Sequence, residues 1–158
     1  MQQLKILNTR EIKKIREQCL KQFDGFLEKE YAYLQTEKGK LFIVNKDLAR
    51  VETKNLRVDR LGLYFAEVKE NQIRLSKEGA QLLADEAKEN NKTLKNVIPL
   101  TQEEVKKYFT GEYLQKDLGE ENRLVLLQYD NDVFGCAKYK DKEIINFLPK
   151  IHRGEVII

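Results

Sequence analysis

The stretch from residue 123 to residue 148 alternates between β-rich runs and very short polar connectors, and this pattern constrains the fold most. The runs cover 123–129, 133–139 and 143–148 and are rich in apolar, β-branched and aromatic residues. Asp130-Asn131-Asp132 and Lys140-Asp141-Lys142 separate them and have the composition of tight hairpin turns. Because turns this short join antiparallel neighbours, the sequence predicts a three-stranded meander.

A strand and a helix precede the meander. Residues 96–98 form a short apolar run, which we expect to be a strand. Thr101 and Glu104 have the spacing of a capping box, and Gly111 is placed to end the helix that follows. The predicted buried face of that helix carries Val105, Tyr108 and Phe109. A further turn is expected over 112–115.

Two more helices are predicted in the first part of the chain. Asn8 and Glu11 have the spacing of a second capping box. An apolar stripe at helical spacing follows it at Ile12, Ile15, Cys19 and Phe23. We therefore expect a helix over about 9–23. Ser76 caps the other helix, which the polar residues 89–92 end. Its apolar side carries Ala80, Leu83, Ala84 and Ala87.

Four short β-rich runs lie between these two helices. They cover 31–35, 41–44, 61–68 and 72–75. The first two read as a hairpin with Gly39 in the tight position, and Glu70-Asn71 makes the turn between the last two. Between the two pairs we expect a short helix through Leu48 and Val51 and then a polar loop over 52–59.

These elements predict an α+β fold in two domains. Residues 1–92 form a small mixed α/β domain, and the boundary lies between Glu89 and Asn96. Residues 93–158 form a small mixed β-barrel built from a strand, a helix and the meander, with a last short strand over 155–158.

Several classes of protein have no support in the sequence. No apolar stretch approaches the ~18 to 20 residues of a membrane span, and the first seven residues lack the apolar run of a secretory signal. We expect a cytoplasmic protein without a membrane partner.

No catalytic, cofactor or metal site is predicted. The glycines are isolated and form no nucleotide-binding loop. Cys19 and Cys136 lie far apart, and His152 is the only histidine, which leaves too few ligands for a usual zinc site. An enzyme would need a pocket around His152 or Cys136. We expect no enzyme and no cofactor, and both cysteines are interpreted as buried structural residues.

Charge is nearly balanced, so any polyanion-binding surface must be local. Lys plus Arg number 29 and Asp plus Glu 26, a net charge of +3. Residues 101–158 carry nine basic and eleven acidic residues, so the first 100 residues carry +5. The final strands nevertheless hold five cations within sixteen positions, opposed only by Asp141 and Glu143. These cations are Lys138, Lys140, Lys142, Lys150 and Arg153.

Strand alternation suggests how some of these cations are arranged. From Val133, one face would carry Val133, Gly135, Ala137 and Tyr139, and the other Phe134, Cys136, Lys138 and Lys140. Lys138 and Lys140 would then lie side by side, with Lys142 in the turn. Such a row could hold phosphates. Lysines at strand ends also serve simply to keep a sheet edge in solvent, and the pattern alone leaves both interpretations open.

Four segments of the chain resemble a known architecture. They are Arg60–Glu67 with Gln72–Ser76 and Ala80–Leu83, then Lys107–Leu114, Asn131–Lys138 and Ile145–Arg153. In order and spacing they resemble the pre-PUA plus PUA architecture of the ribosome-biogenesis factor Nip-seven and the PUA-like C-terminal domain of Sun-type RNA cytosine methyltransferases. Val133 and Ala137 stand where that pattern has proline and a second glycine.

The resemblance implies a pre-PUA domain over 1–92 and RNA binding by a PUA-like domain over 93–158. Carried over by position, the RNA-binding residues are Lys116, Lys138, Lys140, Lys142, Lys150 and Arg153. No methyltransferase motif is present, so the implied role is non-catalytic: binding structured RNA, rRNA or tRNA, during ribosome biogenesis, rRNA processing or RNA modification. The implied protein partners are pre-ribosomal proteins or an RNA-modifying enzyme. The alternative is a protein-interaction adaptor without direct RNA contact, motivated by the acidic stretch from Glu103 to Glu121.

Overall fold

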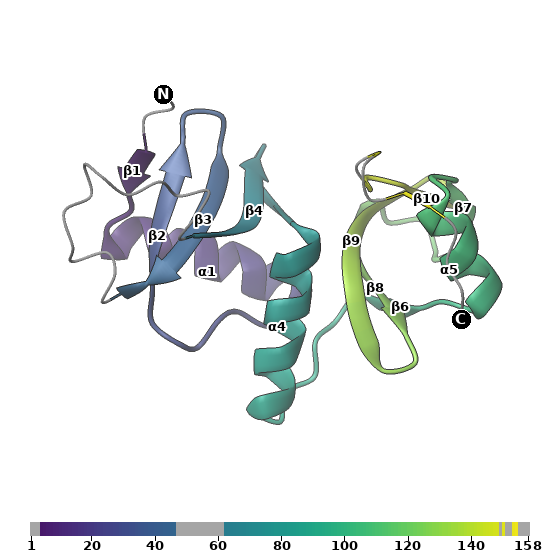
Figure 1. Cartoon of the computed structure of the whole chain (residues 1–158), viewed down its shortest axis with the longest axis horizontal. Helices are drawn as coiled ribbons and strands as arrows, with labels where there is room; N and C mark the ends of the chain where they lie inside the picture. Colours follow the sequence, from purple (N-terminus) through teal and green to yellow (C-terminus); the bar gives the residue numbers. More distant parts are fainter. Residues whose placement is uncertain (1–3, 47–61, 149, 151–152, 155–158) are drawn as a thin grey trace. The chain divides into compact units, whose positions relative to one another are not determined.

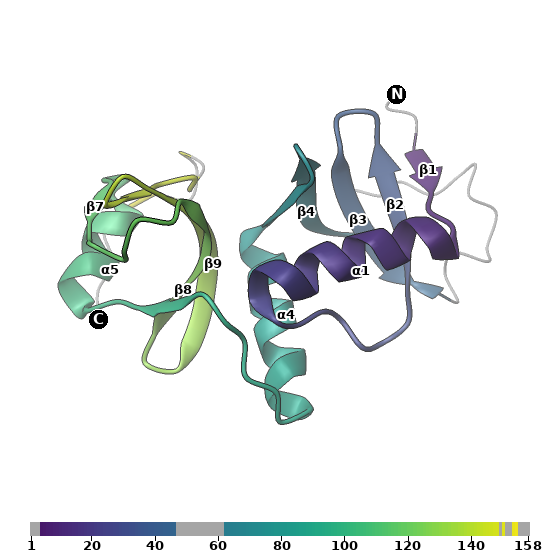
Figure 2. The same cartoon turned by 180° about the vertical axis from the view of Figure 1, so that it is seen from behind.

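The chain forms two compact units, Met1–Lys95 and Asn96–Ile158. The computed structural model describes residues 4–46, 62–148, 150 and 153–154, and Figures 1 and 2 show their elements from opposite sides. Each unit has its own sheet. The α+β fold expected from the sequence is confirmed, whereas the identification of the first unit as a pre-PUA domain stays a prediction.

In its described residues, the first unit is a five-stranded antiparallel sheet with two helices. The strands follow the order β1-β2-β3-β4-β5 across the sheet. They are β1 (Leu4–Ile6), β2 (Tyr31–Thr36), β3 (Lys40–Asn45), β4 (Leu63–Lys69) and β5 (Gln72–Leu75). The helices are α1 (Thr9–Phe23) and α4 (Lys77–Glu89). The strand β1 was not predicted. The helix expected through Leu48 and Val51 and the loop expected over 52–59 lie outside the described residues.

The predicted start of α1 is confirmed. Asn8 Oδ1 accepts the backbone N–H of Glu11 at 2.9 Å, and the Glu11 carboxylate accepts the N–H of Asn8 at 3.2 Å. This capping box satisfies two N–H groups that a helix start leaves unpaired. The apolar stripe then places Ile15, Cys19 and Phe23 in the core.

The hairpin turns of the first unit are set by backbone conformation. Glu70 and Asn71 are both left-handed, with φ of 52° and 61°, which is the geometry of a two-residue hairpin turn. Gly39 has φ of 91°, and a Cβ there would lie 2.4 Å from the carbonyl oxygen of Val68. Only glycine fits that approach, so the predicted hairpin with Gly39 in the tight position is confirmed.

The second unit is a mixed half-barrel sheet that packs against the helix α5 (Gln102–Phe109). Its strand order is β6-β8-β9-β10-β7, with β6 parallel to β8 and the other neighbours antiparallel. The strands are β6 (Val97–Pro99), β7 (Leu114–Gln115), β8 (Arg123–Tyr129), β9 (Asp132–Lys140) and β10 (Glu143–Ile145). The helix α5 begins at the predicted capping box. The core includes Val105, Tyr108, Leu127, Ala137, Tyr139 and Ile144.

The predicted meander is confirmed, and its two turns are alike. Asp130 and Asn131 have φ of 47° and 72°, and Asp141 and Lys142 have φ of 50° and 65°. Left-handed conformation at both central residues twists a two-residue turn to match the strands on either side.

Two predictions at the edge of this sheet are wrong. The turn expected over 112–115 is replaced in part by β7, because Leu114 is buried and pairs with Ile144 of β10. The strand expected over 143–148 ends at Ile145. It ends there because the buried Asn146 side chain bonds to the last turn of α5, to the chain just after it and to the backbone of Leu148.

The alternation expected from Val133 is also wrong at its start. Gln128 pairs with Val133, but Leu127 pairs with Gly135, so β9 carries one extra residue at a bulge. The regular alternation begins at Gly135. Phe134 therefore packs against the core cluster, although it was predicted for the opposite face.

Gly79 in α4 provides a test of the packing between α4 and β4 in the first unit. Alanine is normally better than glycine within a helix by about 1 kcal/mol. A Cβ at Gly79, however, would lie 2.0 Å from the carbonyl oxygen of Phe65, which is backbone and cannot move aside cheaply. We expect Gly79→Ala to lower the free energy of unfolding by about 1–3 kcal/mol in urea denaturation.

Gly154→Ala is the matched control for this substitution. Nothing lies within 4 Å of a Cβ built at Gly154, so we expect a change within about 0.5 kcal/mol. Equal stability of the Gly79→Ala and Gly154→Ala proteins would contradict the close contact between α4 and β4.

Candidate nucleic-acid interface

Two of the predicted lysines share one face of β9. Lys138 and Lys140 are two residues apart in the regular part of the strand, so their side chains point the same way. Lys138 is half-buried between its strand partners Leu124 and Ile145, whereas Lys140 is exposed and pairs with Glu143 across the hairpin. The aliphatic stem of Lys138 can rest on these apolar neighbours while its ammonium group reaches solvent.

Tyr139 fixes the direction of these two lysines. Its side chain is fully buried, and its hydroxyl group donates to the carbonyl of Gly119 at 2.6 Å and accepts the N–H of Leu118 at 2.9 Å. Because neighbouring strand residues point to opposite faces, an inward Tyr139 requires Lys138 and Lys140 to point outward.

Lys142 lies in the turn that follows. The turn is held in place by the N–H of Asp141, which donates to Asn122 Oδ1 at 3.1 Å. Lys142 Nζ is 3.8 Å from the carboxylate of Asp117, and the two side chains are 60% and 65% exposed. A pair as exposed as this is worth little free energy, so the Lys142 charge stays available to an incoming anion.

Lys116 differs from the other predicted lysines because a carboxylate neutralises it. Its ammonium group lies 3.1 and 3.3 Å from the two oxygens of Glu104, and the two side chains are only 29% and 21% exposed. Burial raises the pKa of Glu104, but the N–H of Thr101 and the Lys116 ammonium outweigh it and hold that pKa below its usual value. Lys116 therefore ties β7 to the start of α5.

Arg153 and Lys150 lie near the end of α5 rather than on the β9–β10 hairpin. Arg153 Nε donates to the carbonyl of Leu148 at 2.9 Å, and the N–H of Arg153 donates to the carbonyl of Lys150 at 3.2 Å. The Arg153 side chain lies over Gly111, where a Cβ would come within 2.9 Å of its Cδ and Nη1. Glycine at 111 makes room for this guanidinium group.

Asn146 sets the position of the segment that carries Arg153. Its amide nitrogen donates to the carbonyls of Tyr108 and Glu112 at 2.6 and 3.0 Å, and its amide oxygen accepts the N–H of Leu148 at 2.8 Å. The side chain is buried with all three bonds made. Leu148 in turn accepts the Arg153 bond, so Asn146 connects the end of α5 to this cation.

An aromatic cluster joins two segments that carry the family resemblance. Phe134 lies 5.6 Å, between ring centroids, from both Tyr108 and Phe109, and these two rings are 5.5 Å apart. A Cβ on the neighbouring Gly135 would lie 3.5 Å from the hydroxyl oxygen of Tyr108. The segment around Gly111 and the segment around Gly135 thus form one packed region. Burial raises the pKa of Tyr108 to about 12, so the hydroxyl group is neutral near pH 7.

Arg123 is a cation whose guanidinium group makes contacts within the second unit. Its guanidinium group donates to Asn96 Oδ1 at 3.0 Å and to the carbonyls of Leu118 and Glu121 at 3.3 and 2.8 Å. Its central carbon lies 5.3 Å from the centre of the Tyr139 ring. These contacts use most of its donors.

The exposed face of α1 was missed as a candidate site. Arg10, Lys13, Lys14 and Lys21 are exposed there, on the side opposite the buried stripe. Within the residues that the structure describes, none of these four forms an ion pair. The same helical spacing that identified the apolar stripe places them together, and the sequence analysis used it only for the core.

The described residues show no other chemical site of the kinds considered. Cys19 and Cys136 are buried and not in a disulfide. Among the described side chains, no three of the types His, Cys, Asp and Glu gather closely enough to hold a metal ion. None of the helices in the described ranges is long and apolar enough to cross a membrane. His152 lies outside the described residues.

Comparison with known families identifies the second unit. Residues 95–153 match the family model for the PUA domain of methyltransferase RsmF, so this part of the chain is a PUA domain. Domains of this kind typically bind RNA and occur in RNA methyltransferases. The match covers the PUA domain only. No curated protein matches the chain significantly.

The ion pair of Lys116 predicts a pH effect. A carboxyl group whose pKa is lowered by folding stabilises the protein above its unfolded pKa, and that stabilisation is lost as the pH falls through the folded pKa. Lys116→Gln removes one cause of the shift, so we expect the Glu104 pKa to rise in a carboxyl-carbon NMR titration. Lys138→Gln is the control and should leave it unchanged. A Glu104 pKa that is the same in wild type and Lys116→Gln would contradict the pair.

Proposed function

We propose that this chain, whose residues 95–153 are a PUA domain, is a non-catalytic RNA-binding module that acts on structured RNA during rRNA or tRNA maturation or modification. RNA phosphates would contact Lys138, Lys140 and Lys142 on the β9–β10 hairpin and Lys150 and Arg153 near the end of α5. Lys116, although predicted at the same interface, would contribute through structure because Glu104 neutralises it.

One observation carries the proposal. Lys138 and Lys140 project from the same face of a strand that the buried Tyr139 holds in register. In the described part of the chain, neither has a carboxylate oxygen within 4 Å of its ammonium group. Ordered cations without such a partner are the groups that release counterions when they meet a phosphate backbone.

The chemistry favours recognition of RNA shape over a base sequence. Lysine ammonium groups are compact point charges that contact phosphates without fixed geometry. Phosphate contacts set position and orientation but carry no sequence information directly. A folded RNA, which presents phosphates at defined spacings, fits such a surface better than an unstructured strand. Any modification chemistry would come from a partner enzyme.

A second function is favoured by the carboxylates near the same sheet edge. Glu104 pairs with Lys116 and Asp117 lies near Lys142, which lowers the net positive charge there. In that case the PUA domain would act as a protein-interaction adaptor without direct RNA contact. Failure to retain tRNA even at low salt would favour this function over RNA binding.

Substitutions in β9 test the RNA interface. We expect Lys138→Gln with Lys140→Gln to weaken binding to purified tRNA without unfolding the domain, because the substitutions remove the charge but keep a polar side chain and the first part of each aliphatic stem. The slope of log affinity against log salt should fall by about 0.7 to 0.9 for each phosphate that the variant no longer neutralises. Fluorescence anisotropy across a salt series measures both quantities, and circular dichroism checks the fold.

Lys116→Gln is the matched control at the same sheet edge. It also removes a positive charge, but one that already has a carboxylate partner, so the salt slope should change little. Unchanged tRNA affinity in the β9 double variant, or an equal loss in Lys116→Gln, would refute the proposed site. If the site is supported, crosslinking in cells followed by sequencing of the attached RNA would identify the RNA target.

The exposed face of α1 provides a separate prediction. We expect Arg10→Gln, Lys14→Gln and Lys21→Gln together to reduce tRNA affinity at low salt, because these exposed cations lie on one helix face. A control protein with Lys38→Gln, Lys69→Gln and Lys95→Gln loses the same charge at scattered exposed positions. An equal reduction of affinity in the two proteins would show attraction by net charge only, with no contact at α1.

A further inference from the structure

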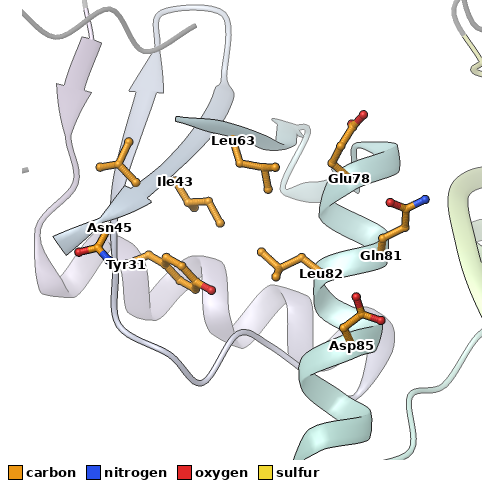
Figure 3. Close-up of a pocket in the computed structure, with 9 residues that line it drawn as sticks. Tyr31, Ile43, Asn45, Leu63, Glu78, Gln81, Leu82 and Asp85 are labelled. Atoms are coloured by element: carbon orange, nitrogen blue, oxygen red, sulfur yellow. The ribbon is translucent and has the colours of Figure 1, made fainter. Parts of the chain in front are cut away.

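The first unit contains a cavity of about 440 Å³ between α4 and the sheet. Figure 3 shows Ile43, Leu63 and the Tyr31 ring approaching it from the strands and Leu82 from the helix. Cavities of this size lie in the lower part of the range that holds ligands, about 300–1,000 Å³. This cavity is largely open to solvent, so side chains of a partner can enter it.

The strand side of the cavity is apolar except for the exposed Asn45. Ile43 is buried and pairs with Leu63 across β3 and β4. The Tyr31 hydroxyl donates to the buried carboxylate of Glu86 at 3.1 Å, so the ring is held in place. Burial and then this bond to Glu86 raise the pKa of Tyr31 to about 12, so this wall stays neutral near pH 7.

The helix side of the cavity is acidic. Glu78, Gln81, Leu82 and Asp85 line it from α4, and their spacing of three, four and seven residues places them on one helix face. Glu78 and Asp85 are exposed, and among the described residues neither pairs with a cation. Their positions are about 10 Å apart along the helix axis, at 1.5 Å per residue.

Two lysines on neighbouring segments form exposed pairs with carboxylates other than Glu78 and Asp85. Lys46, next to the cavity residue Asn45, pairs with Glu30 at 3.2 Å. Lys29 lies 3.7 Å from the carboxylate of Glu89. Among the described residues, no cation forms an ion pair with this acidic rim, which lies beside an apolar floor.

We propose that this cavity binds a basic segment of a partner protein, in which aliphatic side chains fill the floor and lysine or arginine contacts Glu78 and Asp85. Charge complementarity selects this occupant, because a carboxylate rim repels phosphates and an aliphatic floor offers nothing to a bare cation. The cavity would bind protein, whereas the cations of the second unit bind RNA, and neither proposal rests on the other.

The spacing of the rim defines a probe. A capped Arg-Leu-Leu-Arg peptide places its two arginine Cα atoms about 10 Å apart when extended, which matches the two carboxylates. Matched Glu-Leu-Leu-Glu and Gln-Leu-Leu-Gln peptides keep the aliphatic part and change the charge. Methyl NMR spectra of the full chain during titration report contact with Ile43, Leu63 and Leu82.

We expect the arginine peptide to shift those three methyl signals and to bind more tightly than the other two peptides. Glu78→Gln with Asp85→Asn should weaken it about threefold to tenfold, the range of two partly exposed ion pairs, and high salt should reduce the difference. Glu37→Gln with Glu70→Gln is the control, because it removes two exposed carboxylates from hairpin turns outside the cavity. Affinity for tRNA should survive in the Glu78→Gln, Asp85→Asn protein.

Three results would overturn the proposal. One is equal binding of the arginine and glutamate peptides, and another is no shift at the cavity methyl groups. The third is a set of nuclear Overhauser contacts, in the free protein, between Leu82 and residues 47–61, because the chain itself would then occupy the cavity. Loss of tRNA binding in the β9 double variant would leave this proposal standing, so the two can fail separately.

Discussion

The inward position of Tyr139 determines how the rest of the PUA domain presents its charge. The ring lies in the core, and its hydroxyl group is bonded on both sides to the loop at Leu118 and Gly119. A one-residue slip of β9 would expose this ring and bury Lys138 and Lys140 instead. Burying two unpaired ammonium groups is far more unfavourable than any surface contact is favourable. The burial of Tyr139 therefore sets both the register of β9 and the outward direction of its lysines.

Features that depend on a few neighbouring residues could be predicted from the sequence. Both capping boxes need only residues three apart, and each is formed as expected. The turns at Glu70-Asn71, Asp130-Asn131 and Asp141-Lys142 each contain Asn or Asp, which tolerate the left-handed backbone. The other residues of these turns adopt it because a two-residue hairpin requires it at both positions. The shared face of Lys138 and Lys140 followed from the same local rule of alternation.

Features that depend on distant pairing could not be predicted in this way. The ion pair of Lys116 exists because β7 joins the sheet beside β10 and brings residue 116 to the start of α5. The bulge that turns Phe134 inward appears only when β8 is aligned with β9. The shared face of the α1 cations could have been predicted from helical spacing. That they form no ion pair with a described carboxylate is visible only in the folded structure.

Asn146 limits which residues its position can accept. Aspartate would lack the N–H donors and would bring a buried charge toward the carbonyls of Tyr108 and Glu112, whereas leucine, of similar shape, would leave those carbonyls and the Leu148 N–H unpaired. Glutamine has the right groups on a stem one carbon too long. Sequences that keep the guanidinium group of Arg153 on Gly111 are therefore expected to keep an amide at 146, although that amide is buried and its hydrogen bonds go to Tyr108, Glu112 and Leu148.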